Sequence, residues 1–218
     1  MPRTSPPNPD TAAKAAHAQV ALLYQLLETE LGGVQVYRTA LVCALDPDLR
    51  AEWGRYLAQT ERHVVVARRL LDKLGHDPDA ELPARVLVRH DAEGLVNLMM
   101  EALAATSPDD AQLVAAECVV KAETKDHLNW SLLGMLAKQA TGAHAEAMRA
   151  AHAEVEADED HHLYHSTGWC RELWIKALGL PAALPPPEEQ RDVGSAVEAA
   201  EARADREQMT TRRAGGGR

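Results

Sequence analysis

Glu159 and His162 stand three residues apart, the spacing at which a carboxylate and an imidazole on neighbouring helical turns can bind one metal ion. A helical period of about 100° per residue places both on one stripe of the segment 151–169, together with Val155. Such ligands suit iron, manganese or zinc, and two such helices facing each other can hold a pair of ions. A carboxylate in an apolar stripe costs several kcal/mol unless something pairs with it, so the spacing predicts a metal site.

The competing interpretation is a charged surface without a metal. The chain has 10 His and 33 acidic residues, so a Glu three positions before a His also arises by chance. Asp158, Asp160, His161 and His165 fall on the opposite face of the same segment, where a solvated acidic surface explains them. The metal interpretation therefore needs partner ligands elsewhere in the chain.

The composition predicts a helical protein with an affinity for cations. Its 218 residues allow one domain with tails, and 46% are apolar while only 4% are aromatic. Because strand-like alternation is scarce, closely packed helices are favoured. The formal net charge of −10 argues against a nucleic-acid partner and suits a protein that attracts cations.

The cysteines and the apolar segments of the sequence indicate the cellular compartment of the protein. The three Cys, at positions 43, 118 and 170, show no Cys-x-x-Cys pairing, so we expect reduced thiols in a cytoplasmic protein. The first ten residues lack the apolar segment of a signal peptide, and no apolar run approaches the roughly 20 residues that cross a bilayer. We therefore expect no membrane partner.

Capping residues, prolines and glycines divide the chain into helices. We expect long helices over residues 11–45, 49–74, 108–139 and 143–178, and a short helix over 91–105. Tight turns at Asp46-Pro47 and Thr141-Gly142 make each pair of neighbours an antiparallel hairpin. The predicted fold is an all-α four-helix bundle of two antiparallel hairpins, joined by a long crossover that contains the short helix. Residues 1–10, and the Pro-rich linker and tail of residues 181–218, are expected to be disordered.

Other long helices offer further candidate ligands. On the first, Glu30 and Tyr37 lie on the apolar face, seven residues apart. On the third, His127 belongs to the predicted inner stripe, Glu123 lies at its edge, and Asp126 follows three residues later. A carboxylate cluster beside an inward His repeats the chemistry of the last helix.

The second long helix is ambiguous. Its predicted inner stripe holds the residues Trp53, Leu57, Thr60, Val64 and Leu71. Glu61 and His63 flank that stripe on opposite sides, so either can turn inward but the two cannot share its centre. Glu61 is the favoured ligand, His63 is the second choice, and a charged flank is the alternative for both.

These features together resemble the ferritin-like superfamily of di-iron carboxylate proteins, over about residues 11–179. ETELGGVQVY looks like the first helix of bacterioferritins, and ADEDHH looks like their fourth-helix Glu-x-x-His. The nearer likeness is to the small bacterial stress-associated ferritin-like proteins. Their second, crossover and third segments are similar, in order, to LAQTERHVVVARRLLDKLG, EGLVNLMMEALAAT and AECVVKAETKDHLNWSLLGMLAKQATG.

The resemblance implies a set of site residues. It makes Glu30 the first-helix ligand, Glu123 with Asp126 the third-helix ligands and Glu159 with His162 the fourth-helix pair, and Tyr37 resembles the tyrosine near such centres. The chain departs from the family on the second helix, where Thr60 stands in place of the Glu that would accompany His63. The site is then asymmetric, recruits His127, or holds a single ion.

The implied function is that of a metal-binding stress protein. One or two iron ions, or manganese, would react with Fe(II), oxygen or peroxide, and ferroxidase-like or peroxide-handling activity is left open. Ligation without thiolate argues against structural zinc. A homo-oligomer is compatible with such a bundle.

Two other functions stay open. The first is a stress-associated bundle that binds a partner, in which metal only pins the helices or is absent. The second is a di-iron oxygenase, whose organic substrate would need a pocket next to small residues such as Gly33, Ala116, Ser131 and Gly134. The tail segment 192–195 is faintly similar to the tags that load some ferritin-like proteins into protein shells, with a solvated linker as the alternative.

Overall fold

The structure, a computed structural model, describes residues 9–181, 200–201 and 204–205. These residues contain no strand, and their five long helices are α1 (Pro9–Cys43), α2 (Pro47–Lys73), α3 (Pro83–Ala105), α4 (Pro108–Gln139) and α5 (Gly142–Ala177). The expected all-helical class is confirmed. The largest difference is in α3, which begins at Pro83 instead of residue 91, and other ends of α1, α2 and α5 move by one or two residues. α1 and α3 both begin at a proline, which is compatible with the first turn of a helix. Residues 1–8 and most of the tail, including segment 192–195, lie outside the described residues.

Local signals in the sequence set the helix ends. The Asp46 side chain accepts hydrogen bonds from two backbone N–H groups in the first turn of α2, and Ser107 accepts one in the first turn of α4. Each cap is followed directly by a proline. After α2, Gly75 has a φ of +78°, a left-handed conformation that glycine adopts without steric cost and that ends the helix.

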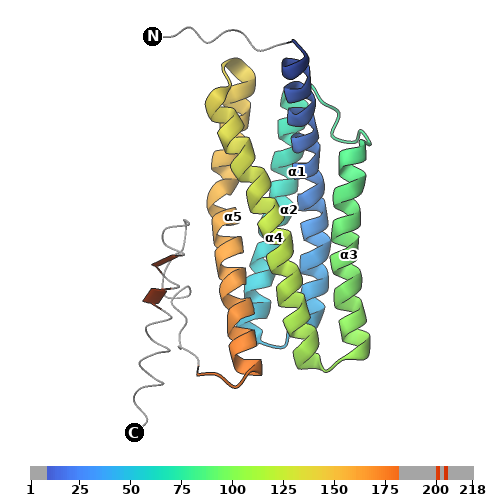
Figure 1. The fold of residues 1–218 in the computed structure, drawn as a ribbon, viewed down its shortest axis with the longest axis vertical. Helices are drawn as coiled ribbons and strands as arrows, with labels where there is room; N and C mark the ends of the chain where they lie inside the picture. The colour runs from blue at the N-terminus through green and yellow to red at the C-terminus, as the bar shows by residue number, and fades with distance from the viewer. Residues whose placement is uncertain (1–8, 182–199, 202–203, 206–218) are drawn as a thin grey trace.

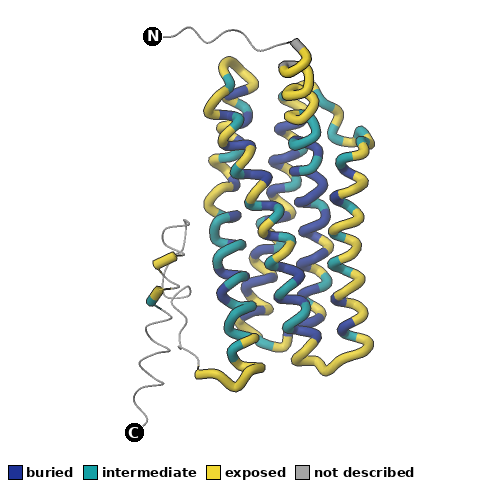
Figure 2. The backbone as a smooth tube through the Cα atoms, in the orientation of Figure 1, coloured by how far each residue is buried: buried dark blue, intermediate teal, exposed yellow. Residues whose placement is uncertain are grey.

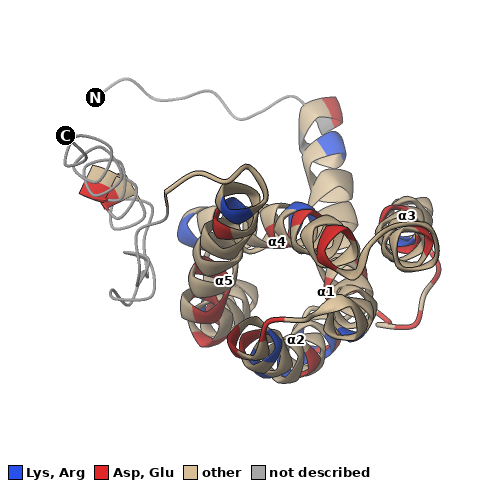
Figure 3. Ribbon diagram, turned by 90° about the horizontal axis from the view of Figure 1, so that it is seen from below, with Lys and Arg blue, Asp and Glu red and all other residues tan. Residues whose placement is uncertain are grey.

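Four helices surround a common interior, and α3 lies outside them (Figure 3). Residues 44–46 join α1 to α2, and residues 140–141 join α4 to α5, so each pair forms an antiparallel hairpin (Figure 1). α3 contacts α1 and α4 and carries the chain from one end of the bundle to the other. The helix predicted in the crossover, α3, therefore makes up most of the connection between α2 and α4.

Polar residues form a layer between two apolar clusters. One cluster includes Leu27, Val66, Trp130 and Val155, and the other includes Val36, Tyr56, Val119 and Trp169. On each of the four central helices, the buried acidic or His residues at positions 30, 63, 123, 126, 159 and 162 fall between the segments that build these clusters. The buried residues face the interior of the bundle along its length (Figure 2).

The crossover helix is fixed to α1 by a close approach and a buried ion pair. A Cβ on Gly32 would lie 2.5 Å from the Cβ of Ala92, so only glycine allows this approach. Glu28 accepts hydrogen bonds from Arg85 Nε and Arg89 Nε, each at 2.7 Å. Glu28 and Arg85 are both buried, which makes this pair a specific anchor for α3.

None of the helices in the described part of the chain combines the length and the apolar character that crossing a membrane requires.

Candidate metal centre

Six ionisable side chains from the four central helices meet in the polar layer. α1 supplies one carboxylate, α2 one imidazole, α4 two carboxylates and α5 a carboxylate with an imidazole. Their relative exposures leave no room for solvation by bulk water: Glu30 0%, His63 1%, Glu123 2%, Asp126 4%, Glu159 1% and His162 0%. Such a set needs internal compensation, because buried charges are stable only when they are paired or bind a metal.

Glu159 joins two groups of donors. Its Oε1 lies 3.0 Å from His63 Nδ1 and 3.6 Å from His162 Nδ1. Glu30 Oε1 approaches the first imidazole at 3.5 Å, and Glu123 Oε2 approaches the second at 3.5 Å. The ligand atoms of Glu30, His63 and Glu159 lie within 4.8 Å of one another, as do those of Glu123, Glu159 and His162.

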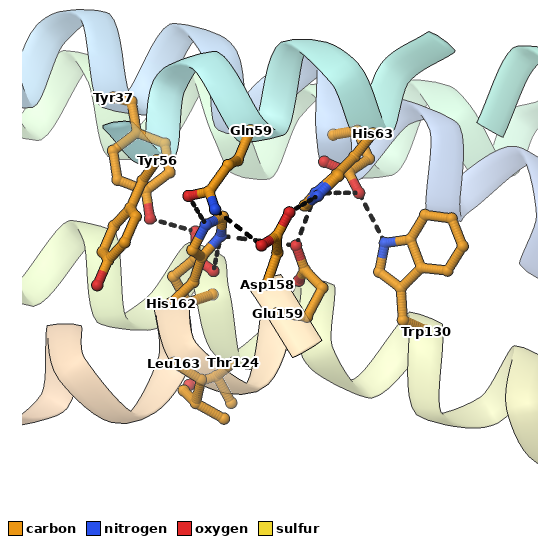
Figure 4. Close-up of polar contacts among 12 residues, drawn as sticks. Tyr37, Tyr56, Gln59, His63, Thr124, Trp130, Asp158, Glu159, His162 and Leu163 are labelled. Carbon is orange, nitrogen blue, oxygen red and sulfur yellow. Dashed lines mark hydrogen bonds and ion pairs between the residues drawn. The ribbon is translucent and has the colours of Figure 1, made fainter. Parts of the chain in front are cut away.

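These separations suit shared ions. Two donors bound to one ion at about 2.0–2.2 Å, with angles between 90° and tetrahedral, lie about 3.0–3.5 Å apart. The four contacts of 3.0, 3.5, 3.5 and 3.6 Å are close to that range. Glu159 therefore belongs to two donor groups, each with separations that suit one ion (Figure 4).

Outer contacts orient both imidazoles. Gln59 donates its Nε2 to Asp158 at 2.7 Å, which leaves its Oε1 as the acceptor for His162 Nε2 at 3.0 Å. His63 Nε2 contacts Asp158 Oδ2 at 3.2 Å. A proton held on each Nε2 leaves the Nδ1 lone pair facing Glu159, which is the usual way an outer hydrogen bond fixes a metal-binding His.

Two aromatic residues hold the carboxylates. Trp130 Nε1 donates to Glu30 Oε1 at 2.6 Å, and the Tyr37 hydroxyl donates to Glu123 Oε1 at 2.7 Å. Each bond occupies one oxygen of a carboxylate. In both residues the second oxygen has no hydrogen-bond partner among the described residues.

The inner atoms are not a completed hydrogen-bond network. Within the described chain, Nδ1 of His63, Nδ1 of His162, both oxygens of Glu159 and Oδ1 of Asp126 also have no hydrogen-bond partner. Each unsatisfied buried polar atom costs about 1–3 kcal/mol, and most such atoms in proteins are paired. Cations held by the two donor groups would satisfy the atoms of His63, His162 and Glu159.

The pKa values of several buried groups in the layer are raised, as expected where carboxylates lie close together. Burial raises the pKa of Glu159, and the neighbouring Glu30 carboxylate adds to this, giving a value of about 8. Burial and the charge of Glu159 also hold the pKa of Asp126 well above its usual range. Burial alone would lower the pKa of His63, but its contacts with Glu159 and Glu30 raise it to about 10. Protons thus bind this layer tightly, and cations can replace them.

Two predicted ligands lie elsewhere. The preference for Glu61 over His63 is wrong: the Glu61 side chain is 48% exposed and bonds to Arg38 at 2.7 Å, whereas His63 lies in the layer. His127 does not join the cluster, because it lies at the edge of α4 and its Nε2 contacts Asp160 Oδ1 at 2.6 Å. The predicted stripes were rotated by part of a turn on α2 and α4.

His165 is also placed differently from the prediction. It is buried, with Nδ1 3.3 Å from Glu52 Oε1, rather than on an outer acidic surface. Sequence reasoning also missed Gln59 and Glu52. The available signal was the spacing of Glu52, Tyr56, Gln59 and His63, whose steps of four, three and four residues follow one face of a helix.

Thr60 is buried on the inner side of α2, but it is not among the residues of the two donor groups. The site is thus asymmetric, as the sequence predicts: α5 supplies both a carboxylate and an imidazole, whereas α2 supplies an imidazole without a carboxylate at position 60. Asp126 on α4 supplies the fourth carboxylate of the layer instead.

Comparison of the chain with protein-family models, curated proteins and solved structures finds no match. Any assignment of function therefore rests on the chemistry of the residues.

Proposed function

We propose that the bundle is a ferritin-like metal-binding protein that holds two first-row divalent ions, iron or manganese, in the polar layer. The observation that carries this proposal is the pair of anchored imidazoles, His63 and His162, whose unpartnered Nδ1 atoms both face Glu159 within the described chain. In the proposed arrangement Glu30 and His63 bind one ion, Glu123 and His162 bind the other, and Glu159 contacts both.

The donor set favours iron or manganese. Three carboxylates of the donor groups, with Asp126 as a fourth in the same layer, can balance the charge of two divalent ions, and two neutral imidazoles would complete the ligands. No thiolate belongs to either donor group, so the site lacks the ligands that structural zinc sites commonly use. Iron bound here supplies one-electron chemistry towards oxygen or peroxide.

The surrounding residues support such chemistry through position. Tyr37 holds one oxygen of Glu123, and its ring lies 6.2 Å from that of His162, with the planes at 74°. The apolar clusters on both sides of the layer separate the ions from bulk water. Two hairpins joined by the crossover helix α3 also match the arrangement expected of a ferritin-like bundle.

The alternatives receive less support. A bundle without metal would be expected to spread its buried polar residues into separate, satisfied pairs, whereas these converge at ligand distances. An oxygenase needs a substrate pocket next to its ions. The cavity of about 330 Å³ between α1, α3 and α4 is lined by Gly33, but none of the six layer residues lines it.

The test compares two substitutions on α2. His63→Ala removes a proposed ligand, and Glu61→Ala, two positions away on the exposed side, is its matched control. Metal-free protein is loaded with Fe(II) without oxygen, freed of unbound ions and assayed by elemental analysis. Wild type and Glu61→Ala should bind the same number of ions per chain, and His63→Ala should bind at least one fewer.

Exposure to oxygen tests the redox part of the proposal. Wild-type protein should consume oxygen in proportion to its bound Fe(II), and His63→Ala should consume much less. Equal iron contents in all three proteins would contradict the assigned site. Full iron binding without oxygen consumption would leave a metal-binding bundle and refute the oxidative role.

A further inference from the structure

A second group of potential ligands lies outside the polar layer, towards the turn between α1 and α2. Glu52 on α2 faces His161 and His165, which stand one turn apart on α5. Their ligand atoms all lie within 4.8 Å of one another. None of these residues belongs to the two donor groups of the central site.

The Glu52 carboxylate is held in place from two sides. Trp169 Nε1 donates to its Oε2 at 2.8 Å, and the Tyr56 hydroxyl donates to its Oε1. These two hydrogen bonds fix the orientation of the Glu52 carboxylate.

His165 supplies an independent indication of a ligand. Its side chain is buried, at 7% relative exposure, and its Nε2 has no hydrogen-bond partner in the described chain. Its Nδ1 lies 3.3 Å from Glu52 Oε1. That separation lies within the range expected for two donors that share an ion.

His161 completes the group on its accessible side. Its ring stacks on that of His165 with centroids 3.7 Å apart and planes at 22°, and one of its ring nitrogens already lies within 4.8 Å of the other two ligand atoms. Because His161 is partly exposed, an ion from solution can reach this group without crossing the apolar clusters.

We propose that Glu52, His161 and His165 form a second site, for one divalent ion of the zinc and iron class. Two imidazoles and one carboxylate are a common protein ligand set for these ions, and solvent fills the remaining positions. The ring of Tyr56 separates this site from the central one, with centroids 4.2 Å from His162 and 5.8 Å from His161. The proposal does not depend on the function assigned to the central site.

The test is a titration of metal-free protein with Zn²⁺, read by calorimetry and by elemental analysis after dialysis. The variants are His165→Ala and His161→Ala, and His144→Ala is the matched control, an exposed His on the same helix. Each of the first two should bind one Zn²⁺ per chain fewer than wild type or the control. His63→Ala should lose an ion of the central site but keep this one, so adding His165→Ala to it should remove one further Zn²⁺ per chain.

Two results would overturn the proposal. The first is an unchanged Zn²⁺ stoichiometry and affinity in both His165→Ala and His161→Ala. The second is no further loss of Zn²⁺ when His165→Ala is added to His63→Ala, which would place the ion in the central site. If circular dichroism shows that His165→Ala is unfolded, the partly exposed His161→Ala decides the question alone.

Discussion

Replacing Glu159 with glutamine should make the metal-free protein more stable at pH 7 while removing its response to metal. With a pKa of about 8, Glu159 is mostly protonated at pH 7 in the folded protein. In the unfolded chain its pKa returns to about 4.3 and the group is ionised. Folding must therefore take up a proton, at a cost of roughly 3 to 4 kcal/mol at pH 7.

The sign of this effect follows from the raised pKa. The cost is absent below about pH 4, where both states are protonated, and it grows as the pH rises towards 8. Glutamine has no such cost and has nearly the shape of the protonated side chain. Metal-free Glu159→Gln should therefore melt up to roughly 6–16 °C above wild type at pH 7, taking 2–4 °C per kcal/mol for a domain of this size.

Metal should reverse the order of the two proteins. An ion present at 100 times its dissociation constant stabilises wild type by about 2.7 kcal/mol per site. Glu159→Gln loses the ligand that both sites share, so it should gain far less. The assay is thermal unfolding followed by far-ultraviolet circular dichroism at pH 4 and pH 7, with chelator or with Mn(II).

Glu146→Gln provides the control, because it makes the same chemical change at an exposed position of α5. It should leave both the melting temperature and the response to Mn(II) near the wild-type values. A metal-free Glu159→Gln that melts below wild type at pH 7 would refute the argument that the raised pKa of this carboxyl costs stability at that pH. An undiminished response to Mn(II) would refute its place in the centre.

Two further predictions concern the attachment of the crossover helix. Gly32→Ala should lower the free energy of unfolding by about 1–3 kcal/mol, because the new Cβ overlaps Ala92. Gly94→Ala, whose new Cβ meets open space in α3, should raise it by about 0.5–1 kcal/mol. Urea denaturation measures both free energies, and equal effects of the two substitutions would contradict the close approach. Glu28→Gln should cost about 3–5 kcal/mol at pH 7, because it leaves Arg85 buried without its partner. Burial alone would raise the pKa of Glu28, but its hydrogen bonds to Arg89 and Arg85 lower it. The ionised Glu28 therefore stabilises the fold above about pH 4.3, and the difference in stability between wild type and Glu28→Gln should shrink as the pH falls further. A difference in stability that does not change with pH in urea titrations would show that the charge of Glu28 is not its cause.

The positions of the helices could be predicted because their signals are local. Proline, glycine and capping side chains act within a few residues, and they mark the ends of α2 and α4 closely. Glu30, Glu159 and His162 were also placed correctly on inner faces, because each follows its apolar neighbours at helical spacing. Local spacing was sufficient in both cases.

The rotation of α2 could not be predicted in this way. An apolar stripe selects Leu57 and Val64, which are only partly buried, over Tyr56 and His63, which are fully buried. The polar atoms of the latter pair find partners on α5 or on α2 itself only after the helices pack. His165 was misplaced for the same reason, since the carboxylate that accompanies it comes from another helix.

The candidate ligands of the central site are divided between the two hairpins. Glu30 and His63 come from α1 and α2, whereas Glu123, Glu159 and His162 come from α4 and α5. Each hairpin can form through contacts close in sequence, but the complete centre requires the two to dock across a long crossover. Bound ions would then act as removable cross-links that form late in folding. Such contacts slow unfolding more than they speed folding, so the lifetime of the folded protein would depend on how fast its ions dissociate.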